Sequence, residues 1–211
     1  MGSTEDAASG RAERPGGSAP FRQTLLRARL VSGNQHKLRE LRRALPGWEL
    51  GLIEAGDLPP EVGETYYENA LAKARFGRET GDEAAWMLGE DSGLEVEGLS
   101  GAPGLRSARW AGGEHVARVI EALRGVEGEG RRARYVCELV ALSPAGEDLR
   151  GTGVLEGAIA DQPRGAAGFG FDPVFVPEGE ERTLAELGDE WKAENSHRAR
   201  AARALLEALS G

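Results

Sequence analysis

Residues 25–45 read LLRARLVSGNQHKLRELRRAL, and this stretch decides which kind of fold to expect. The run from Leu25 to Val31 is short and bears apolar residues, as is typical of a strand, and Gly33-Asn34 interrupts it. From Gln35 to Leu45 leucines recur at helical spacing until Pro46-Gly47 stops the pattern, and Asn34 stands where a helix cap belongs. The segment therefore predicts a strand, a tight loop and a helix in succession.

The rest of the chain alternates between the same two patterns. Residues 133–142 and 149–159 are expected to pair as a hairpin through the Ser-Pro-Ala-Gly turn at 143–146. Hairpin strands together with strand–helix units indicate an α/β or α+β fold with a mixed sheet. Further strands are expected at 48–53, 84–88, 94–99 and 174–176, and further helices at 66–80, 116–123 and 196–209.

The first 22 residues differ in composition from the rest of the chain. They are rich in Gly, Ala, Ser, Glu and Arg and show no apolar periodicity, which predicts a disordered extension. Residues 23–211 are long enough for a single catalytic domain with one sizeable core. No run of about 20 apolar residues is present, so we expect a cytoplasmic protein with no membrane partner.

Charge and cysteine content exclude several classes of protein. The formal net charge of -9 argues against a protein that binds nucleic acid, because such binding depends on many cations that neutralise phosphates. It does not exclude a small anionic ligand held in a compact pocket. The single cysteine, Cys137, lies in a strand-like run, so a disulfide within the chain is excluded and a buried apolar role is expected.

The loop between the first strand and the first helix is a candidate phosphate site. Free N–H groups and the helix dipole at a helix N-terminus attract anions, and Lys37 adds a positive charge one turn in. An ordinary strand–helix connection capped by Asn34, with Lys37 facing water, explains the same residues. The candidate phosphate-binding residues are Ser32, Gly33, Asn34, Gln35, His36 and Lys37.

The helix expected at 66–80 begins with a second candidate segment. Thr65 and Glu68 have the spacing of a capping box, in which Glu68 closes the helix N-terminus. Asn69 and Lys73 are four residues apart and therefore share a helix face, where they and Glu68 could serve a metal–phosphate ligand. The structural and the functional reading are equally supported by this segment alone.

Two adjacent carboxylates, Glu90 and Asp91, follow the apolar run at 84–88 and precede Ser92-Gly93. Carboxylates at a strand end suit magnesium, which commonly binds one or two of them together with substrate phosphates. A local turn, in which Asp91 or Ser92 bonds the backbone, is the structural alternative. We favour the functional interpretation, because apolar runs lie directly on both sides.

Two further segments have the composition of a nucleoside pocket. At 168–173 glycines alternate with Phe169 and Phe171, so that a ring can stack on a planar ligand while Asp172 accepts hydrogen bonds; two rings plugging the core is the alternative. At 192–198 three cations gather where the last helix begins, with Ser196 as its expected cap. Cations there oppose the helix dipole, so a compensating anion is expected.

Taken in order, these segments resemble the inosine triphosphate pyrophosphatase family. The resemblance extends from about Leu30 to Leu209 and rests on several motifs in register. They are Ser-Gly-Asn-x-x-Lys at 32–37, Glu-Asn-Ala-x-x-Lys-Ala at 68–74, Asp-Ser-Gly-Leu-Glu-Val at 91–96, Gly-Ala-Pro-Gly at 101–104 followed by Ser-Ala-Arg, Gly-Phe-Gly-Phe-Asp-Pro at 168–173, and Ser-His-Arg at 196–198.

The resemblance implies a magnesium-dependent enzyme that hydrolyses non-standard purine nucleoside triphosphates (ITP, dITP and XTP) to the monophosphate and pyrophosphate. It implies that residues 32–37 contact the triphosphate, that Glu68 and Asp91 hold Mg²⁺, and that Asp91 is also the base for the attacking water. Lys37 and Lys73 would neutralise phosphate charge. The implied remaining substrate contacts are Ser92, then Phe169, Gly170, Phe171 and Asp172 around the nucleoside, and Lys192, His197 and Arg198 at the purine and its 6-oxo group.

The resemblance also implies an elongated mixed sheet flanked by helices, with two lobes around a central substrate cleft, and a homodimer. The chain is shorter than many relatives between Gly113 and Val116. Two alternatives stay open: a pyrophosphatase for other modified nucleotides, and a nucleotide-binding regulator without turnover. Intact Glu68 and Asp91 argue against the second.

Overall fold

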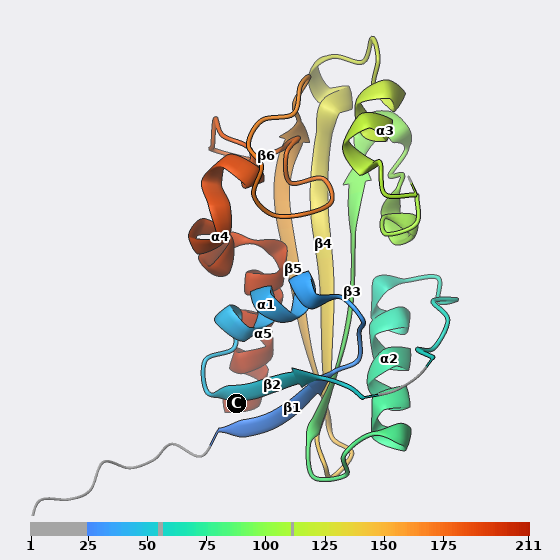
Figure 1. Cartoon of the computed structure of the whole chain (residues 1–211), viewed down its shortest axis with the longest axis vertical. Coiled ribbons are helices and arrows are strands. Elements are labelled where there is room, and N and C mark those ends of the chain that lie inside the picture. Colours follow the sequence, from blue (N-terminus) through green and yellow to red (C-terminus); the bar gives the residue numbers. More distant parts are fainter. Residues whose placement is uncertain (1–24, 55–56, 111) are drawn as a thin grey trace, which may run out of the picture.

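The computed structural model describes residues 25–54, 57–110 and 112–211 and contains one six-stranded sheet (Figure 1). The strand order is β2-β1-β3-β4-β5-β6; β1 pairs in parallel with β2 and β3, and the other neighbours are antiparallel. The strands are β1 (Leu26–Leu30), β2 (Trp48–Leu52), β3 (Trp86–Val96), β4 (Arg132–Leu142), β5 (Asp148–Ile159) and β6 (Phe175–Pro177). The helices are α1 (Gln35–Ala44), α2 (Tyr66–Thr80), α3 (His115–Ala122), α4 (Leu184–Asn195) and α5 (His197–Ser210).

The long strands β3, β4 and β5 run the length of an elongated molecule and join two groups of elements (Figure 1). The lower group contains β1, β2, α1, α2 and α5, and its main core gathers leucines of α1 and β1 with Leu205 of α5. The upper group contains α3, α4 and β6, and its core surrounds Phe171 and Phe175. The expected mixed sheet with two lobes is therefore confirmed.

Glycines in the long strands let two helices lie unusually close to the sheet. A Cβ on Gly89 of β3 would lie 1.8 Å from the carbonyl oxygen of Ala70 in α2. On β5, a Cβ on Gly153 would lie 2.0 Å from the carbonyl oxygen of His197, and one on Gly151 would lie 2.1 Å from that of Ala201. The sheet can accept α2 and α5 at these positions because glycine has no side chain.

Most expected elements are found within one or two residues of their predicted ends, and two differ. The runs at 84–88 and 94–99 are not separate strands, because residues 86–96 form the single strand β3. Asp91 therefore lies in the middle of a strand, and neither the strand end nor the local turn considered for it exists. Helix α4 was not predicted, although Thr183 and Glu186 form a capping box at its start.

Residues 1–22, for which a disordered extension is predicted, lie outside the described residues. The assignment of 23–211 to a single domain stays a prediction. Within the described ranges, no helix combines the length and apolar character needed to cross a bilayer.

Candidate active site

The candidate site lies where β3 extends beyond the end of its pairing with β1. Pairing between the two strands ends at Leu30 and Leu88, and the last bond on that side joins the Val31 N–H to the Leu88 carbonyl at 2.8 Å. The chain then turns into α1, where the Asn34 side chain accepts hydrogen bonds from the N–H groups of His36 and Lys37. The cap predicted at Asn34 is confirmed, and α1 begins beside the open edge of β3.

Asp91 faces α2, since alternate residues of a strand point to opposite faces of the sheet. Its carboxylate accepts hydrogen bonds from Asn69 Nδ2 at 3.1 Å and from Lys73 Nζ at 3.0 Å. The same Lys73 ammonium bonds Glu61 Oε1 at 2.6 Å, and Arg109 bonds the other oxygen of Glu61 at 2.7 Å. Two carboxylates thus flank one ammonium at the N-terminal half of α2.

Burial and the charge of the ion-pair partner have opposite effects on the pKa values of Asp91 and Lys73. Burial raises the pKa of Asp91, and the nearby Glu90 carboxylate adds to the rise, which the Lys73 charge only partly offsets. The pKa of Lys73 is also raised: burial lowers it, but Asp91 and Glu61 more than compensate. Asp91 is therefore a stronger base than an exposed aspartate while Lys73 stays charged, as general-base chemistry requires.

Glu68 makes the capping contacts that its spacing predicted. Its Oε2 accepts hydrogen bonds from the N–H groups of Glu64 at 2.7 Å and Thr65 at 3.1 Å, and Thr65 Oγ1 accepts one from the Glu68 N–H. The capping box is confirmed. The structure thus brings Asn69 and Lys73 to Asp91, whereas the Glu68 carboxylate bonds the backbone at the start of α2.

Glu90 points to the other face of the sheet, toward α1 and α5. It is completely buried and pairs with Lys37 Nζ at 2.5 Å and Arg198 Nε at 3.0 Å. Burial alone would raise the pKa of Glu90, but the Lys37 and Arg198 charges outweigh it and hold that pKa far below its usual range. Glu90 thus provides an anion near the start of α5. The sequence predicted that a compensating anion would be needed there and that a ligand would supply it.

Glu40 of α1 extends this network toward the loop at 168–173. One oxygen accepts a hydrogen bond from Arg198 Nη1 at 2.9 Å, and the other pairs with Lys192. Lys192 in turn bonds Asp172 Oδ2 at 2.6 Å. Opposite charges therefore alternate without a break from the loop to Lys37: Asp172, Lys192, Glu40, Arg198, Glu90 and Lys37.

A cavity of about 190 Å³ opens above this network, between the two lobes. His197 lines it, buried, with its ring stacked on Tyr135 at a centroid distance of 4.5 Å. Neither nitrogen of that ring is hydrogen-bonded in the part of the chain that the structure describes. Burial, aided by the Arg198 charge, holds the pKa of His197 well below its usual value, so the ring is neutral. The lining is Asn34, Lys37, Ser92, Gly93, Ser107, Ala108, His115, Tyr135, Phe169, Gly170, Phe171, Asp172, His197 and Arg198.

The cavity gathers nine of the residues predicted to bind substrate, from four segments of the chain. Lys192 joins them through its bond to Asp172, and Lys73 lies with Asp91 on the other face of β3. His36 contacts the Phe169 ring, at a centroid distance of 4.9 Å, and lines a separate shallow pocket. Ser32, Gly33 and Gln35 belong to the loop and first turn that lead into α1 but do not line this cavity.

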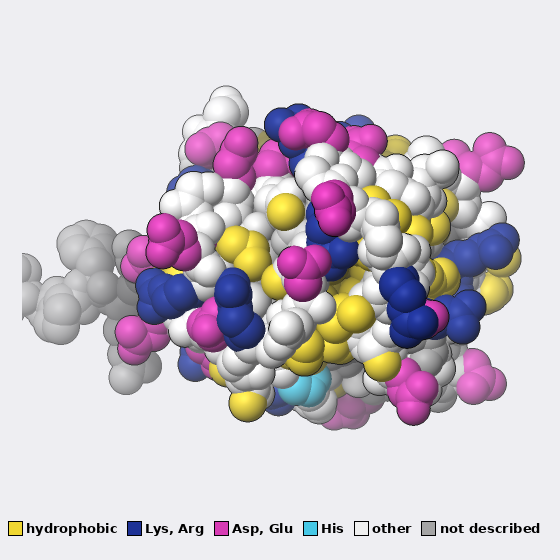
Figure 2. All heavy atoms as spheres, turned by 90° about the horizontal axis from the view of Figure 1, so that it is seen from above, with side chains coloured by type: hydrophobic (Ala, Val, Ile, Leu, Met, Phe, Trp, Pro, Cys, Tyr) yellow, Lys and Arg dark blue, Asp and Glu magenta, His cyan; other side chains and the backbone are white. Residues whose placement is uncertain are grey.

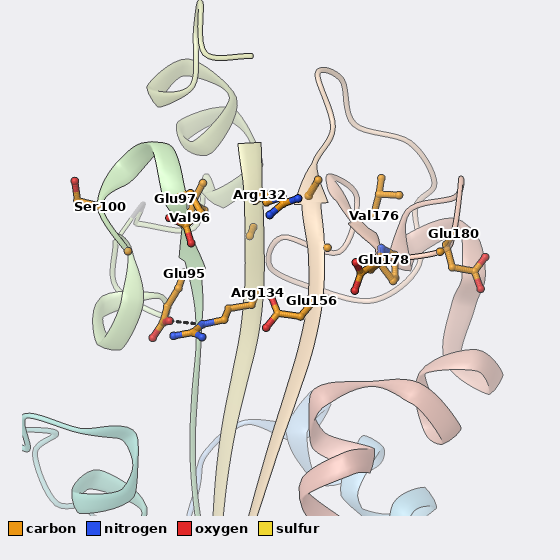
Figure 3. Close-up of a pocket in the computed structure, with 16 residues that line it drawn as sticks. Glu95, Val96, Glu97, Ser100, Arg132, Arg134, Glu156, Val176, Glu178 and Glu180 are labelled. Atoms are coloured by element: carbon orange, nitrogen blue, oxygen red, sulfur yellow. Dashed lines mark hydrogen bonds and ion pairs between the residues drawn. The ribbon is translucent and has the colours of Figure 1, made fainter. Parts of the chain in front are cut away.

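A larger concavity lies at the upper end of the sheet, on the face that α2 covers lower down. There Glu95 of β3 pairs with Arg134 of β4 (Figure 3). Its side chains include five glutamates but only two arginines, so a triphosphate would meet net negative charge there. The upper end of the molecule likewise shows Lys and Arg side chains mixed with Asp and Glu side chains (Figure 2). The cavity between the lobes is therefore the better candidate for a nucleotide.

Comparison with known proteins assigns the chain to a family. A family model described as the Ham1 family matches residues 28–208. The chain belongs to the Ham1 family. A dITP/XTP pyrophosphatase of Thermus thermophilus is 46% identical over 189 residues, covering 85% of this chain and 89% of the relative. The dITP/XTP pyrophosphatase of Bdellovibrio bacteriovorus is 42% identical over 193 residues, covering 85% and 96% respectively.

Solved Ham1 structures have the same fold. A HAM1 protein from Coxiella burnetii matches with a TM-score of 0.75 at 35% identity, covering 88% of this chain and 99% of that one. A nucleoside-triphosphatase described as a dITP/XTP pyrophosphatase, from Mycobacterium abscessus, matches with a TM-score of 0.66 at 38% identity, covering 87% and 100%.

Two carboxylates of the site were not singled out from the sequence. Glu61 lies in a loop after two prolines, and Glu40 lies in a charged helix whose residues look solvated. Their partners are distant in sequence: Lys73 is 12 residues from Glu61, and Arg198 is 158 residues from Glu40. No local pattern could have identified them, because only the folded chain brings these pairs together.

Proposed function

We propose that this chain hydrolyses the non-standard purine nucleoside triphosphates ITP, dITP and XTP to the monophosphate and pyrophosphate. The observation that carries the proposal is the cavity between the lobes, which has phosphate-binding features at one end and a buried, hydrogen-bonding base site at the other. The names of its Ham1 relatives support the same substrates.

The phosphate end of the cavity is formed by the start of α1. Lys37 lies at the cavity, and Lys73 lies beside Asp91 on the other face of β3. Hydrolysis of a phosphoric anhydride depends mainly on neutralised oxygens and a positioned water. We assign Asp91 as the base for that water, since its raised pKa brings it closer to the pH at which a general base is most effective.

The base end explains why ATP would be a poor substrate. The Arg198 guanidinium has five donor hydrogens, and in the described part of the chain it makes three side-chain hydrogen bonds, to Glu90, Glu40 and Ser92. Its remaining donors can bind a 6-oxo acceptor. A 6-amino group would leave buried donors unpaired, which disfavours adenine.

Release of pyrophosphate across a nucleotide panel tests the function. We expect kcat/KM for ITP, dITP and XTP to exceed that for ATP by about a hundredfold or more. Asp91→Asn should lower kcat by about a hundredfold or more, with unchanged thermal stability of the fold as its control. Equal rates on all purines would contradict the specificity, preference for a modified pyrimidine would favour the alternative substrate class, and nucleotide binding without turnover would identify a regulator.

A divalent metal, Mg²⁺ in our proposal, fits the carboxylates near Lys73. Magnesium binds oxygen ligands and commonly uses one or two carboxylates plus phosphates. No group of three or more His, Cys, Asp or Glu residues that could hold an ion is found in the described residues. In our proposal, substrate phosphates and water supply the remaining ligands. Bound there, the ion would neutralise phosphate oxygens and make water more acidic.

Two pairs of residues are candidates for the metal: Asp91 with Glu68, and Asp91 with Glu61. The contacts favour Glu61, because it shares Lys73 with Asp91, whereas Glu68 caps α2. Glu61→Gln should raise the Mg²⁺ concentration for half-maximal activity by about tenfold or more, and Glu68→Gln should mainly lower thermal stability. The reverse pattern in a magnesium titration would restore Glu68 as the ligand.

The proposal includes a homodimer working in the cytoplasm, as the family resemblance implies. Light scattering of the purified protein checks the first point, since a monomer at working concentration would contradict it.

A further inference from the structure

Tyr135 is a cavity residue that neither the sequence motifs nor the proposed reaction has given a role. It lies in β4, paired with Leu94 of β3 on one side and with Leu155 of β5 on the other, so the sheet holds its backbone from both sides. Its side chain is buried and lines the same cavity as Asp172 and His197. Tyr135 is thus a fixed part of the cavity wall.

The Tyr135 ring contacts one aromatic ring from each lobe. Phe175 of β6 is completely buried in the upper core, and its ring centroid lies 4.8 Å from that of Tyr135. His197 begins α5 in the lower lobe, and its ring lies 4.5 Å from Tyr135 with an interplanar angle of only 7°. Phe175 therefore restrains the ring against which the His197 imidazole is stacked.

No hydrogen bond fixes the plane of the His197 ring. Neither ring nitrogen has a partner among the described residues. The torsion that turns an imidazole about its bond to the Cβ atom is broad, because it lacks the three sharp staggered minima of an aliphatic torsion. Packing must therefore set the plane of this ring, and the parallel face of Tyr135 defines it.

The two stacked rings are both uncharged. Burial raises the pKa of Tyr135 well above its usual value, and the Asp172 charge adds to the rise, so the hydroxyl keeps its proton. The lowered pKa of His197 keeps the imidazole neutral. Since no opposite charges attract the pair, the flat faces of the rings account for their arrangement. A substitution that keeps the flat ring of Tyr135 should therefore keep the arrangement.

In the proposed function the base end of the cavity includes His197. Recognition of a purine edge depends on the direction of the imidazole nitrogens, and a ring that is oriented before binding loses less freedom when the substrate enters. We propose that Tyr135 is a positioning residue for base specificity: by stacking on His197 it fixes the plane of the imidazole and thereby favours 6-oxo purines over adenine. This inference rests on the proposed function.

Kinetics on ITP and ATP test the assignment. Tyr135→Leu keeps a buried apolar side chain but removes the flat face, and it should lower the ratio of kcat/KM for ITP to that for ATP by about fivefold, the effect of one aromatic pair. The loss should appear in KM for ITP with kcat unchanged, because the base is remote from the phosphorus that reacts. Tyr135→Phe keeps the ring and should retain most of the ratio.

Ile159→Ala is the control for a loss of stability alone. Ile159 is buried in the same upper core, at the far end of β5, and does not line the cavity. Its truncation should lower the thermal stability of the fold at least as much as Tyr135→Leu does and leave the ratio unchanged. An equal fall of the ratio in Ile159→Ala would show that Tyr135 acts only through stability.

Proton NMR reports the stacking directly. The His197 ring protons, identified by their absence in His197→Gln, should resonate upfield of those of an unstacked histidine, because the ring current of Tyr135 shields them. Tyr135→Leu should abolish this shift, and Tyr135→Phe should preserve it. The same upfield shift in Tyr135→Leu and the wild type would overturn the inference.

Binding of inosine and adenosine monophosphates, measured by calorimetry, separates this inference from the proposed function. If the wild type shows no turnover but Tyr135→Leu lowers its preference for inosine monophosphate, the reaction is wrong and the positioning role stands. If the wild type hydrolyses ITP and Tyr135→Leu abolishes the upfield shift without changing either the kinetic or the binding preference, the positioning role is overturned. An equal loss of preference in Tyr135→Phe and Tyr135→Leu would also overturn it, since the hydroxyl and not the ring face would then be responsible.

Discussion

At the scale of the residue, His197 shows how burial sets a protonation state. Its ring is enclosed between the sheet and α5, stacked on Tyr135, and next to the Arg198 charge. A neutral imidazole can both donate and accept a hydrogen bond, so it can bond either kind of group on a purine edge. An imidazolium could only donate, and it would add a fourth cation beside Lys37, Lys192 and Arg198.

This protonation state predicts a pH-dependent stability. An unfolded histidine titrates near pH 6.5, whereas the folded pKa of His197 lies well below that. Below about pH 6.5 the unfolded chain binds a proton that the native chain does not, so the free energy of unfolding falls as pH falls, by up to about 1.4 kcal/mol per pH unit. Urea unfolding between pH 7.5 and about 5 should show a shallower dependence for His197→Gln than for the wild type.

His36→Gln is the control, because His36 is an exposed histidine outside the core. It should keep the wild-type dependence of stability on pH. Identical slopes for wild type and His197→Gln would show that the ring of His197 is not held neutral in the native state.

At the scale of the element, the first turn of α5 lies close to the sheet and reaches the cavity because the positions of β5 that face this helix are glycines. The Gly153 position lies against the His197 carbonyl and the Ala201 N–H, and Gly151 lies against the next turn. An added methyl must move the helix, because backbone atoms at 2.0 to 2.4 Å cannot give way as a flexible side chain would. Gly153 therefore sets the height of His197 and Arg198 above the sheet.

Gly153→Ala and Gly151→Ala form a matched pair that tests this. Each should lower the free energy of unfolding by about 1–3 kcal/mol through overpacking. Only Gly153→Ala should also reduce discrimination between ITP and ATP, because it displaces the turn that carries His197 and Arg198. Equal discrimination in the two variants, at matched loss of stability, would show that the position of this turn does not control specificity.

The elements also show why some predictions from sequence succeeded and others did not. Strand β1, the Asn34 cap and the hairpin of β4 and β5 follow from local patterns, and all are found. The continuity of β3 was missed because Glu90, Asp91 and Ser92 are poor strand formers. They are extended because Lys37, Lys73 and Arg198 neutralise or bond them from three helices, a tertiary effect that no local window contains.

At the scale of the whole molecule, the long strands carry the site between two separate cores. The order of motifs along the chain was enough to predict a cleft between lobes, because each motif matched a family segment in register. The ion pairs between distant segments were not predictable: Glu40 meets Lys192 and Arg198, and Glu61 meets Lys73, only in the folded chain. Of these pairs, Glu40 with Lys192 joins the two lobes. The sequence identified the cations of the site but not all of their counter-ions.

The unbroken series of charges from Asp172 to Lys37 contains three carboxylates and three cations, so their formal charges sum to zero and the series does not act as a general anion-binding site. Each cation in the series already has a counter-ion that is covalently part of the chain. Free phosphate, chloride or sulfate must compete with a carboxylate that cannot diffuse away, so these abundant solutes gain little by entering. A nucleotide attaches at several points at once, and this multivalence lets it succeed where a small salt ion does not. We therefore expect inorganic phosphate, chloride and sulfate to compete poorly with a nucleotide for this cavity.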